Sequence, residues 1–258
     1  MHLRRRKLQR PYYRRGILQQ DKILMLRKHV RVVRNRNSDQ LGKTAAFLVA
    51  KHLKTFCRRQ KAVALLIPGG NSVKKLFQYL PKQKLPRRVW KKVHFFWADE
   101  RLAGAGSPES NYRTARGMLS RIGVDKKNIH RFPGETTEPE KAARQYAREL
   151  KKAKAGKIDI LVLGVGEDGH VASLFPGHPS LNSRRSFVIV RNSPKLPAVR
   201  MSISPRIIPD AKVIVLLVIG QAKKAALAML LNPKVSARQC PAKFALWPHG
   251  VVYLLTDL

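Results

Sequence analysis

The stretch GVGEDGHVASLFPGHP, residues 164–179, places acids and histidines in a glycine-rich turn directly after the apolar run IDILVLG. Asp168 and His170 are separated by one residue, so both side chains can line one pocket. Histidine carries protons near neutral pH, and a nearby carboxylate orients its imidazole and stabilises the charged form. No G-x-S-x-G elbow surrounds Ser173, which argues against covalent acyl chemistry. These residues predict proton transfer to or from water or a sugar carbon, and leave His178 as a loop residue.

A second polar cluster follows the apolar run AVALLI, where the chain reads PGGNS. Gly69 and Gly70 allow a tight turn, and Asn71 and Ser72 lead into a helical pattern. Backbone amides at the start of a helix can hold a phosphate. The alternative is a plain strand-to-helix turn, because the segment contains neither a Walker GK[ST] sequence nor a GxGxxG sequence.

Two further clusters follow the runs VHFFWA and AKVIVLLVIG. Asp99, Glu100 and Arg101 can bind sugar hydroxyls, transfer protons or shape a crevice, or they can be a capping aspartate and a surface ion pair. Asn111 can add an amide to the same mouth or cap a helix. Lys223 would bring a positive charge to a neighbouring strand end, unless it is one more solvated helix lysine.

Strand patterns alternate with helical patterns along the chain. Apolar runs predict strands at 29–33, 62–67, 93–99, 128–132, 158–164, 186–190, 199–203, 211–220 and 250–258. Helical spacing predicts helices at 38–56, after residue 72, and at 110–123, 137–156 and 221–231. The alternation predicts an α/β fold with a Rossmann-like, mostly parallel sheet, flanked by helices on both faces in a single domain. Ligands bind beyond the carboxyl ends of such strands, so the four polar clusters should meet in one crevice.

Helix ends have recognisable capping residues. Ser38 and Ser110 can cap two of the predicted helices, and Thr137 with Glu140 fits a capping box. Residues 1–28 read as a basic N-terminal extension that precedes the domain at 29–258.

The charge balance is unusual, since 53 Lys and Arg residues against 15 Asp and Glu residues give a formal net charge of +38. Such a charge predicts attraction to polyanions such as nucleic acid. The basic residues are spread along the whole chain, however, without a stripe of interleaved aromatics, so a dedicated nucleic-acid reader is not favoured. A basic polyanion-binding protein on an enzyme scaffold stays open as an alternative from another functional class.

The remaining composition limits the cellular setting. The two cysteines are far apart and lack metal-ligand spacing, which predicts a reducing, cytoplasmic compartment and no structural zinc. No run approaches 18 consecutive apolar residues, so no membrane partner is expected. We expect a monomer that binds a small molecule.

The motifs together resemble 6-phosphogluconolactonases. GVGEDGHVASLFPGHP is similar to that family's signature GxGxDGHxASLFPG, and WADERLAGAGSPESNYRTA to its second signature. LLIPGGNS resembles the family's phosphate loop and IGQAKKAAL its C-terminal helix start, in matching order over about residues 29–258. The resemblance implies a fold shared with glucosamine-6-phosphate deaminases. It also implies hydrolysis of 6-phospho-glucono-1,5-lactone to 6-phosphogluconate in the oxidative pentose phosphate pathway, without metal or cofactor.

The resemblance also implies residue roles. His170 would be the general base for water, supported by Asp168. The expected substrate-binding residues are Gly69, Gly70, Asn71, Ser72, Asp99, Glu100, Arg101, Asn111, Gly169, Arg200 and Lys223. The chain departs from the family at the phosphate loop, which reads PGGNSV where S-G-G-[ST]-x-P is usual.

The nearest alternative is a deaminating aldose-ketose isomerase of the same superfamily. Those enzymes continue from DGH toward an Asn-Glu-Pro segment with a further catalytic acid. Here the continuation is ASLFPG, with no acid before His178, which favours hydrolysis.

Overall fold

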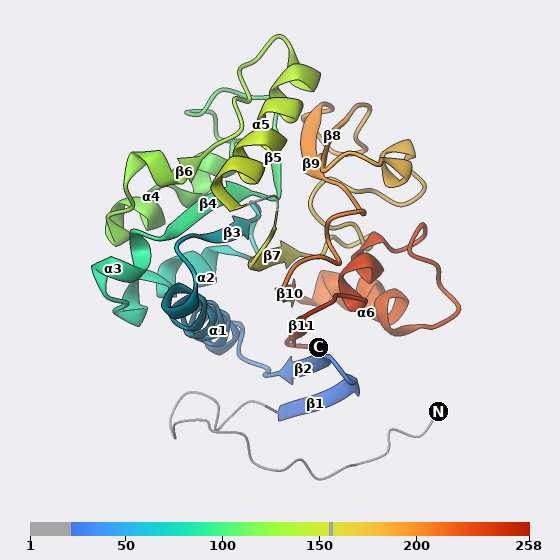
Figure 1. Cartoon of the computed structure of the whole chain (residues 1–258). Coiled ribbons are helices and arrows are strands. Elements are labelled where there is room, and N and C mark those ends of the chain that lie inside the picture. The colour runs from blue at the N-terminus through green and yellow to red at the C-terminus, as the bar shows by residue number, and fades with distance from the viewer. Residues whose placement is uncertain (1–21, 155–156) are drawn as a thin grey trace.

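The computed structural model describes residues 22–154 and 157–258. Its main sheet has eight strands in the order β1-β2-β11-β10-β7-β3-β4-β6 (Figure 1). In this sheet β1 is antiparallel to β2, and the other neighbouring pairs are parallel. The strands are β1 Lys22–Arg27, β2 Val30–Arg34, β3 Val63–Ile67, β4 Val93–Trp97, β6 Ile129–His130, β7 Ile160–Gly164, β10 Val213–Val218 and β11 Val251–Thr256. The predicted α/β class with a mostly parallel sheet is confirmed.

The central strands separate two hydrophobic cores. Alternate side chains of a strand point to opposite faces, and in β3 the residues Val63, Leu65 and Ile67 join one core while Ala64 and Leu66 join the other. A strand buried on both faces needs such an unbroken apolar run. Helices therefore cover both faces, as predicted.

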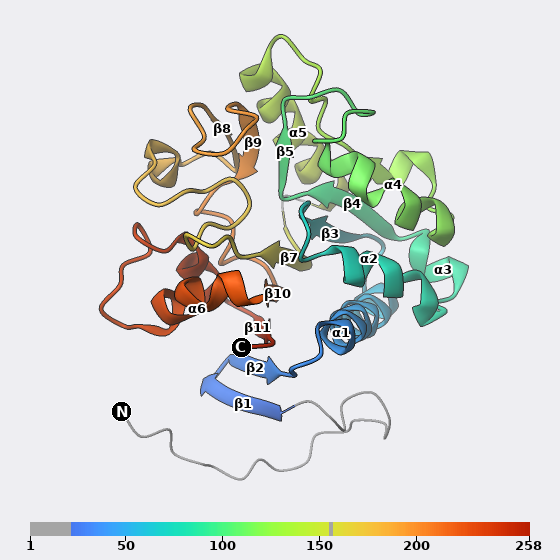
Figure 2. The ribbon, with the colours of Figure 1, turned by 180° about the vertical axis from the view of Figure 1, so that it is seen from behind.

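Four helices cover one face and two cover the other. The first group is α1 Ser38–Arg59, α2 Lys74–Tyr79, α3 Arg87–Trp90 and α4 Asn111–Ile122; the second is α5 Pro139–Lys154 and α6 Lys224–Leu231. Figure 2 shows α1 to α4 on one side of the molecule and α6 on the other. In the described part of the chain, no helix is long and apolar enough to cross a membrane.

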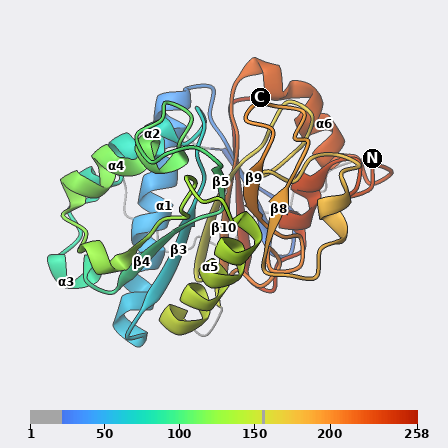
Figure 3. The same ribbon diagram turned by 90° about the horizontal axis from the view of Figure 1, so that it is seen from above.

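A second, antiparallel sheet packs beside the main one. It contains β5 Asp99–Arg101, β9 Arg200–Ile203 and β8 Phe187–Val190 in that order (Figure 3). The runs at 186–190 and 199–203 are strands as expected, but they do not join the parallel sheet. The DER segment is a strand of this second sheet and not a loop, because Asp99, Glu100 and Arg101 pair with Ser202, Met201 and Arg200.

Local hydrogen bonds set the helix ends. Asn37, and not Ser38, caps α1, since its side chain accepts from the amides of Asp39 and Gln40. Ser110 caps α4 as predicted, by accepting from the Arg113 amide. At the predicted capping box the hydroxyl of Thr136, the residue before Thr137, accepts from the Glu138 amide. Glu140 is instead paired with the Arg191 guanidinium, 2.6 Å away.

The main sheet includes a strand from before residue 29. Strand β1 lies within the segment assigned to a basic extension, and it pairs with β2 from Lys22 opposite Arg34 to Arg27 opposite Val30. The hairpin joins the edge of the main sheet through β11. Residues 1–21 of the predicted extension lie outside the described residues.

Candidate active site

The carboxyl ends of β3 and β7, strand β5 and the turn after β10 enclose a cleft of about 260 Å³. Its lining residues are Pro68, Gly69, Gly70, Asn71, Ser72, Asp99, Arg101, Asn111, Gly164, Val165, Gly166, His170, Ala172, Lys195, Leu196, Arg200 and Lys223. Ten of the thirteen residues expected from the sequence lie in this list. The other three, Glu100, Asp168 and Gly169, lie outside the cleft lining.

The loop after β3 owes its shape to two glycines with different tasks. A Cβ on Gly69 would lie 1.7 Å from Oδ1 of Asn111, so only glycine lets the loop approach that side chain. Gly70 has a φ of +81°, in the left-handed region that other residues rarely adopt. Asn71 and Ser72 then lead into α2, which begins at Lys74. The loop therefore brings backbone close to the cleft.

Asp99 is held at the cleft by two buried side chains. Nδ2 of Asn111 donates to Oδ1 of Asp99 at 3.1 Å and to its carbonyl at 2.8 Å. The hydroxyl of Ser173 donates to Oδ2 at 2.8 Å. Ser173 is fully buried and lies 74 residues away in sequence, so the sequence analysis gave it no role at the site. Asn111 and Ser173 thus hold the Asp99 carboxylate in place in the lining of the cleft.

Glu100 stabilises the start of α4 and does not face the cleft. Its oxygens accept from the amides of Arg101, Asn111 and Tyr112 at 2.7 to 2.8 Å, and from the Ser110 hydroxyl at 3.3 Å. Burial raises the pKa of Glu100, against the effect of these amides. Its position at the N-terminus of a helix suits a carboxylate. The structure thus gives Glu100 a structural contact where the sequence predicted a substrate contact.

His170 and Asp168 form a close pair at the turn after β7. Nδ1 of His170 lies 2.5 Å from Oδ1 of Asp168, and the imidazole packs against Phe175 with ring centroids 4.7 Å apart. Burial alone would raise the pKa of the Asp168 carboxyl. The hydrogen bond with His170 and the charge of His170 outweigh this effect and lower the pKa of Asp168 to about 2. Asp168 is therefore ionised at neutral pH and lies behind the imidazole that lines the cleft.

The same turn is closed by glycines. A Cβ on Gly166 would lie 2.0 Å from Nδ1 of His170, so the ring can lie only over a glycine. Gly169 has a φ of +82°, and a Cβ there would lie 2.8 Å from Sγ of Cys240. The amide of Gly166 donates to the His170 carbonyl at 2.8 Å. Gly169 therefore shapes the turn from behind, without touching the cleft.

Four cations line the cleft. Arg101 donates to the Glu109 carbonyl at 2.6 Å, and Nζ of Lys223 lies 3.3 Å from Oε1 of Glu167. Arg200 donates to the carbonyls of Lys195, Leu196 and Pro197 at 2.7 to 3.0 Å. Burial and the charge of Arg101 lower the pKa of Arg200. The cleft thus combines a histidine that is paired with one carboxylate, a second carboxylate held by hydrogen bonds, and several cations, which suits an anionic substrate.

Lys195 is the cleft cation that the sequence analysis missed. It lies in the loop between β8 and β9, and nothing in its sequence surroundings distinguishes it from the other lysines. The carbonyls of residues 195–197 hold the Arg200 side chain, so this loop and the cleft are fixed together.

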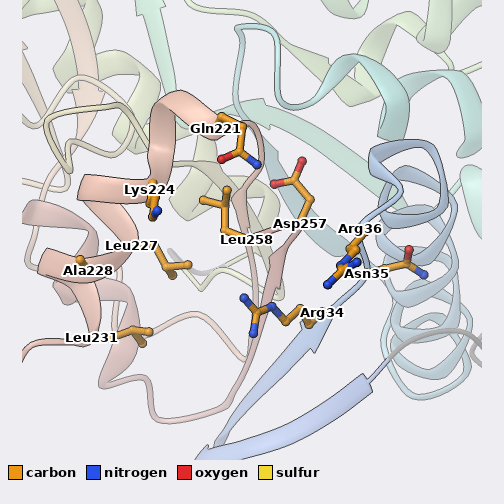
Figure 4. Close-up of a pocket in the computed structure, with 10 residues that line it drawn as sticks. All are labelled: Arg34, Asn35, Arg36, Gln221, Lys224, Leu227, Ala228, Leu231, Asp257 and Leu258. Atoms are coloured by element: carbon orange, nitrogen blue, oxygen red, sulfur yellow. The ribbon is translucent and has the colours of Figure 1, made fainter.

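A larger hollow of about 830 Å³ lies beside the cleft, and Figure 4 shows its lining. Gln221 and Lys224 face this hollow, while Lys223 between them lines the cleft. Asp257 accepts from the Gly220 amide at 2.9 Å and so fixes the start of that turn. The hollow contains none of the expected site residues. The chemistry predicted from the sequence belongs to the smaller cleft.

Comparison with known proteins places the chain in a family. Residues 36–254 match the family described as glucosamine-6-phosphate isomerases/6-phosphogluconolactonase. A 6-phosphogluconolactonase from Synechocystis is 37% identical over 207 residues, which are 78% of this chain and 83% of that protein.

Solved structures share the fold. A 6-phosphogluconolactonase from Thermotoga maritima superposes with a TM-score of 0.75 at 23% identity, covering 88% of this chain and 99% of that one. A monomeric glucosamine-6-phosphate deaminase superposes equally well, with a TM-score of 0.74 at 20% identity over 87% of this chain and 96% of that one. The fold alone therefore does not separate the two activities. The match over 36–254 and the Synechocystis relative together show that the chain belongs to the family of glucosamine-6-phosphate isomerases and 6-phosphogluconolactonases.

Proposed function

We propose that this protein hydrolyses 6-phospho-D-glucono-1,5-lactone to 6-phospho-D-gluconate. The name of the Synechocystis relative, at 37% identity, supports this substrate. The observation that carries the proposal is the His170–Asp168 pair at a cleft that also holds Lys223, Arg200 and the loop 69–72. A base for water and a binding site for a phosphate lie within one small cavity.

The ionised state of Asp168 determines which nitrogen of the neutral His170 imidazole carries the proton. An ionised carboxylate can only accept hydrogen bonds, so Nδ1 of a neutral His170 carries the proton and Nε2 presents a lone pair. We assign Nε2 as the general base. It takes a proton from water, the water oxygen bonds to the lactone carbonyl carbon, and the bond from that carbon to the ring oxygen breaks. The imidazolium returns its proton to the leaving ring oxygen, and the new acid ionises.

The phosphate is assigned to the opposite part of the cleft. Backbone amides of loop 69–72 and the ammonium of Lys223 would hold it, with Lys223 exchanging Glu167 for the phosphate. Arg101 and Asn111 would border the sugar ring. Arg200 contributes charge and, through its three carbonyl contacts, holds Lys195 at the cleft.

Deaminating isomerisation is the competing reaction. It needs a further acid to move a proton between sugar carbons, and the segment 171–177 after His170 contains no acid. In this segment the side chains from Val171 to Phe175 are all buried, and all are apolar except Ser173, whose hydroxyl donates a hydrogen bond to Asp99. This composition favours hydrolysis.

The proposal is tested with purified protein and freshly made 6-phosphogluconolactone, with acid release followed above the spontaneous rate. Glucosamine 6-phosphate is assayed in parallel under the same conditions. We expect accelerated acid release and no ammonia. Lactone hydrolysis at the spontaneous rate, or rapid turnover of glucosamine 6-phosphate, would contradict the proposal.

Four properties stay predictions of the sequence. Within the described residues the buried thiols of Cys57 and Cys240 form no disulfide, which is compatible with the predicted reducing, cytoplasmic location. A monomeric state and place in the oxidative pentose phosphate pathway are likewise proposed. The charge of +38 predicts binding of polyanions in addition to catalysis.

A further inference from the structure

The acids are unevenly distributed along the chain, although the basic residues are spread through all of it. Residues 40–98 contain 14 lysines and arginines and no aspartate or glutamate. The fold packs two parts of this acid-free segment together, since Sγ of Cys57 near the end of α1 lies 3.7 Å from the Val89 carbonyl of α3. The acid-free segment therefore contributes cations from both α1 and α3 to one end of the molecule.

A groove of about 240 Å³ lies between these elements and is lined by Lys54, Arg58, Arg88 and Lys92, together with Cys57, Pro86 and Val89. We call it the α1–α3 groove. The Lys92 ammonium donates to the carbonyls of Cys57 and Gln60 at 2.9 and 3.3 Å, so it also stabilises the end of α1. Lys54, Arg58 and Arg88 are exposed. Within the described residues, these three side chains form no ion pair.

Further cations surround the groove. Arg59, Arg87 and Lys91 adjoin its lining residues in sequence, Lys61 follows three positions after Arg58, and all four are exposed. An acid from another strand at this end of the sheet, Asp159 at the start of β7, is fully buried and paired with Lys212 at 2.8 Å. It therefore does not offset the charge that the groove presents to solvent.

We propose that the α1–α3 groove binds the backbone phosphates of double-stranded nucleic acid. Arginine forks match phosphate geometry, and each neutralised phosphate releases counterions. Single-strand binding relies on exposed aromatic rings that stack on bases. Two aromatic rings adjoin the lining residues in sequence: Trp90 is only 6% exposed, and Phe56 is partly buried against the same core with the Lys212 ammonium over its ring. The groove therefore suits sequence-independent contact with a duplex.

An anionic membrane is less well suited to this surface. Peripheral membrane binding combines basic residues with apolar side chains that enter the bilayer. The exposed large apolar residues of the described chain, Leu196, Leu231 and Trp247, belong to other segments. Charge without an apolar anchor favours nucleic acid.

The groove and the catalytic cleft lie at opposite ends of the sheet. Lys61 and Lys92 precede β3 and β4, whereas the cleft follows the carboxyl ends of these strands. A five-residue strand spans roughly 16 Å. A duplex in the groove leaves the cleft open, so this inference does not depend on the proposed lactonase activity.

The test compares two triple variants of the full chain. K54Q/R58Q/R88Q removes three charges from the groove, and R144Q/R148Q/K151Q removes the same residue types from the exposed side of α5. Binding of a labelled duplex DNA of arbitrary sequence is followed by fluorescence anisotropy at increasing salt. Thermal unfolding of each variant shows that it is folded.

We expect the groove variant to bind at least tenfold more weakly at ~0.1 M salt, with the slope of log affinity against log salt reduced by up to about 2.7. The α5 variant should keep the affinity and slope of the unmodified chain. Equal losses in the two variants would overturn the proposal. So would tighter binding of a single strand than of the duplex, or groove-dependent binding of phosphatidylserine vesicles without binding of the duplex.

Discussion

Oδ1 of Asp168 lies 2.5 Å from Nδ1 of His170, directly behind the ring that lines the cleft. The carboxylate is held ionised, with a pKa of about 2, so it accepts a hydrogen bond from the Nδ1–H group, and the proposed mechanism uses Nε2 as the base. In the proposed mechanism this contact orients the imidazole. It also determines what each residue's substitution should do.

Asp168→Asn should lower kcat by on the order of 10²-fold or more, with a smaller effect on KM, because an amide can donate to Nδ1 and move the imidazole proton to Nε2. Steady-state hydrolysis of the lactone measures both constants. Asp210→Asn is a matched control, since Asp210 contacts an exposed histidine, His249, at 3.4 Å on the surface. Equal kcat values in the two variants would remove Asp168 from the mechanism.

Asp168 should also make stability depend on acid pH. Its pKa is lowered from the usual 3.8 to about 2, so its contribution is fully present above pH 3.8 and disappears as the pH falls through 2. The free energy of unfolding of Asp168→Asn should therefore lie below that of the unmodified protein at neutral pH, and the two should converge near pH 2. Denaturant titrations across this window measure the difference. A difference that is constant with pH would contradict the assigned ionisation.

Lys223→Ala should raise KM about tenfold or more while changing kcat less, because a charge-assisted hydrogen bond to the phosphate is lost. Lys224→Ala is the control, since the neighbouring side chain faces the larger hollow of Figure 4. The two variants remove the same charge one residue apart. If Lys224→Ala raises KM as much as Lys223→Ala does, the lysines act through the overall positive electrostatic field and Lys223 makes no specific contact with the phosphate.

Gly69→Ala should raise KM strongly, because the new methyl group would lie 1.7 Å from Oδ1 of Asn111 and must displace that side chain or the loop. Gly104→Ala is the matched control, since a Cβ at Gly104 meets no atom within 4 Å. Steady-state kinetics on both variants, with thermal unfolding as a check on folding, decide the point. A Gly69→Ala variant with unchanged KM would show that the loop does not contact the substrate.

Sequence reasoning worked where the chemistry is local. The apolar runs placed the parallel strands, and the clusters at their ends placed His170, Lys223 and loop 69–72, which the structure brings to one cleft. The helix cap at Ser110 was likewise visible in sequence. Each of these features depends on neighbouring residues.

The features that sequence reasoning missed depend on contacts between distant segments. Ser173 reaches Asp99 across 74 positions, and Lys195 comes to the cleft because Arg200 binds its carbonyl. Glu100 looked like a ligand residue because its backbone follows a buried strand, but its oxygens are occupied by the first amides of α4. The pairing of β5 with β9 places Asp99, Glu100 and Arg101 beside β9. The spacing of apolar residues along the sequence does not reveal this pairing.

Whether His170 activates the attacking water is decided by kcat of His170→Ala on fresh 6-phosphogluconolactone. We expect a loss of roughly 10²–10⁴-fold, the usual contribution of a general base, with folding and KM largely retained. A loss of less than about threefold in a folded variant, well below the usual range for a general base, would show that the imidazole is not the base for water.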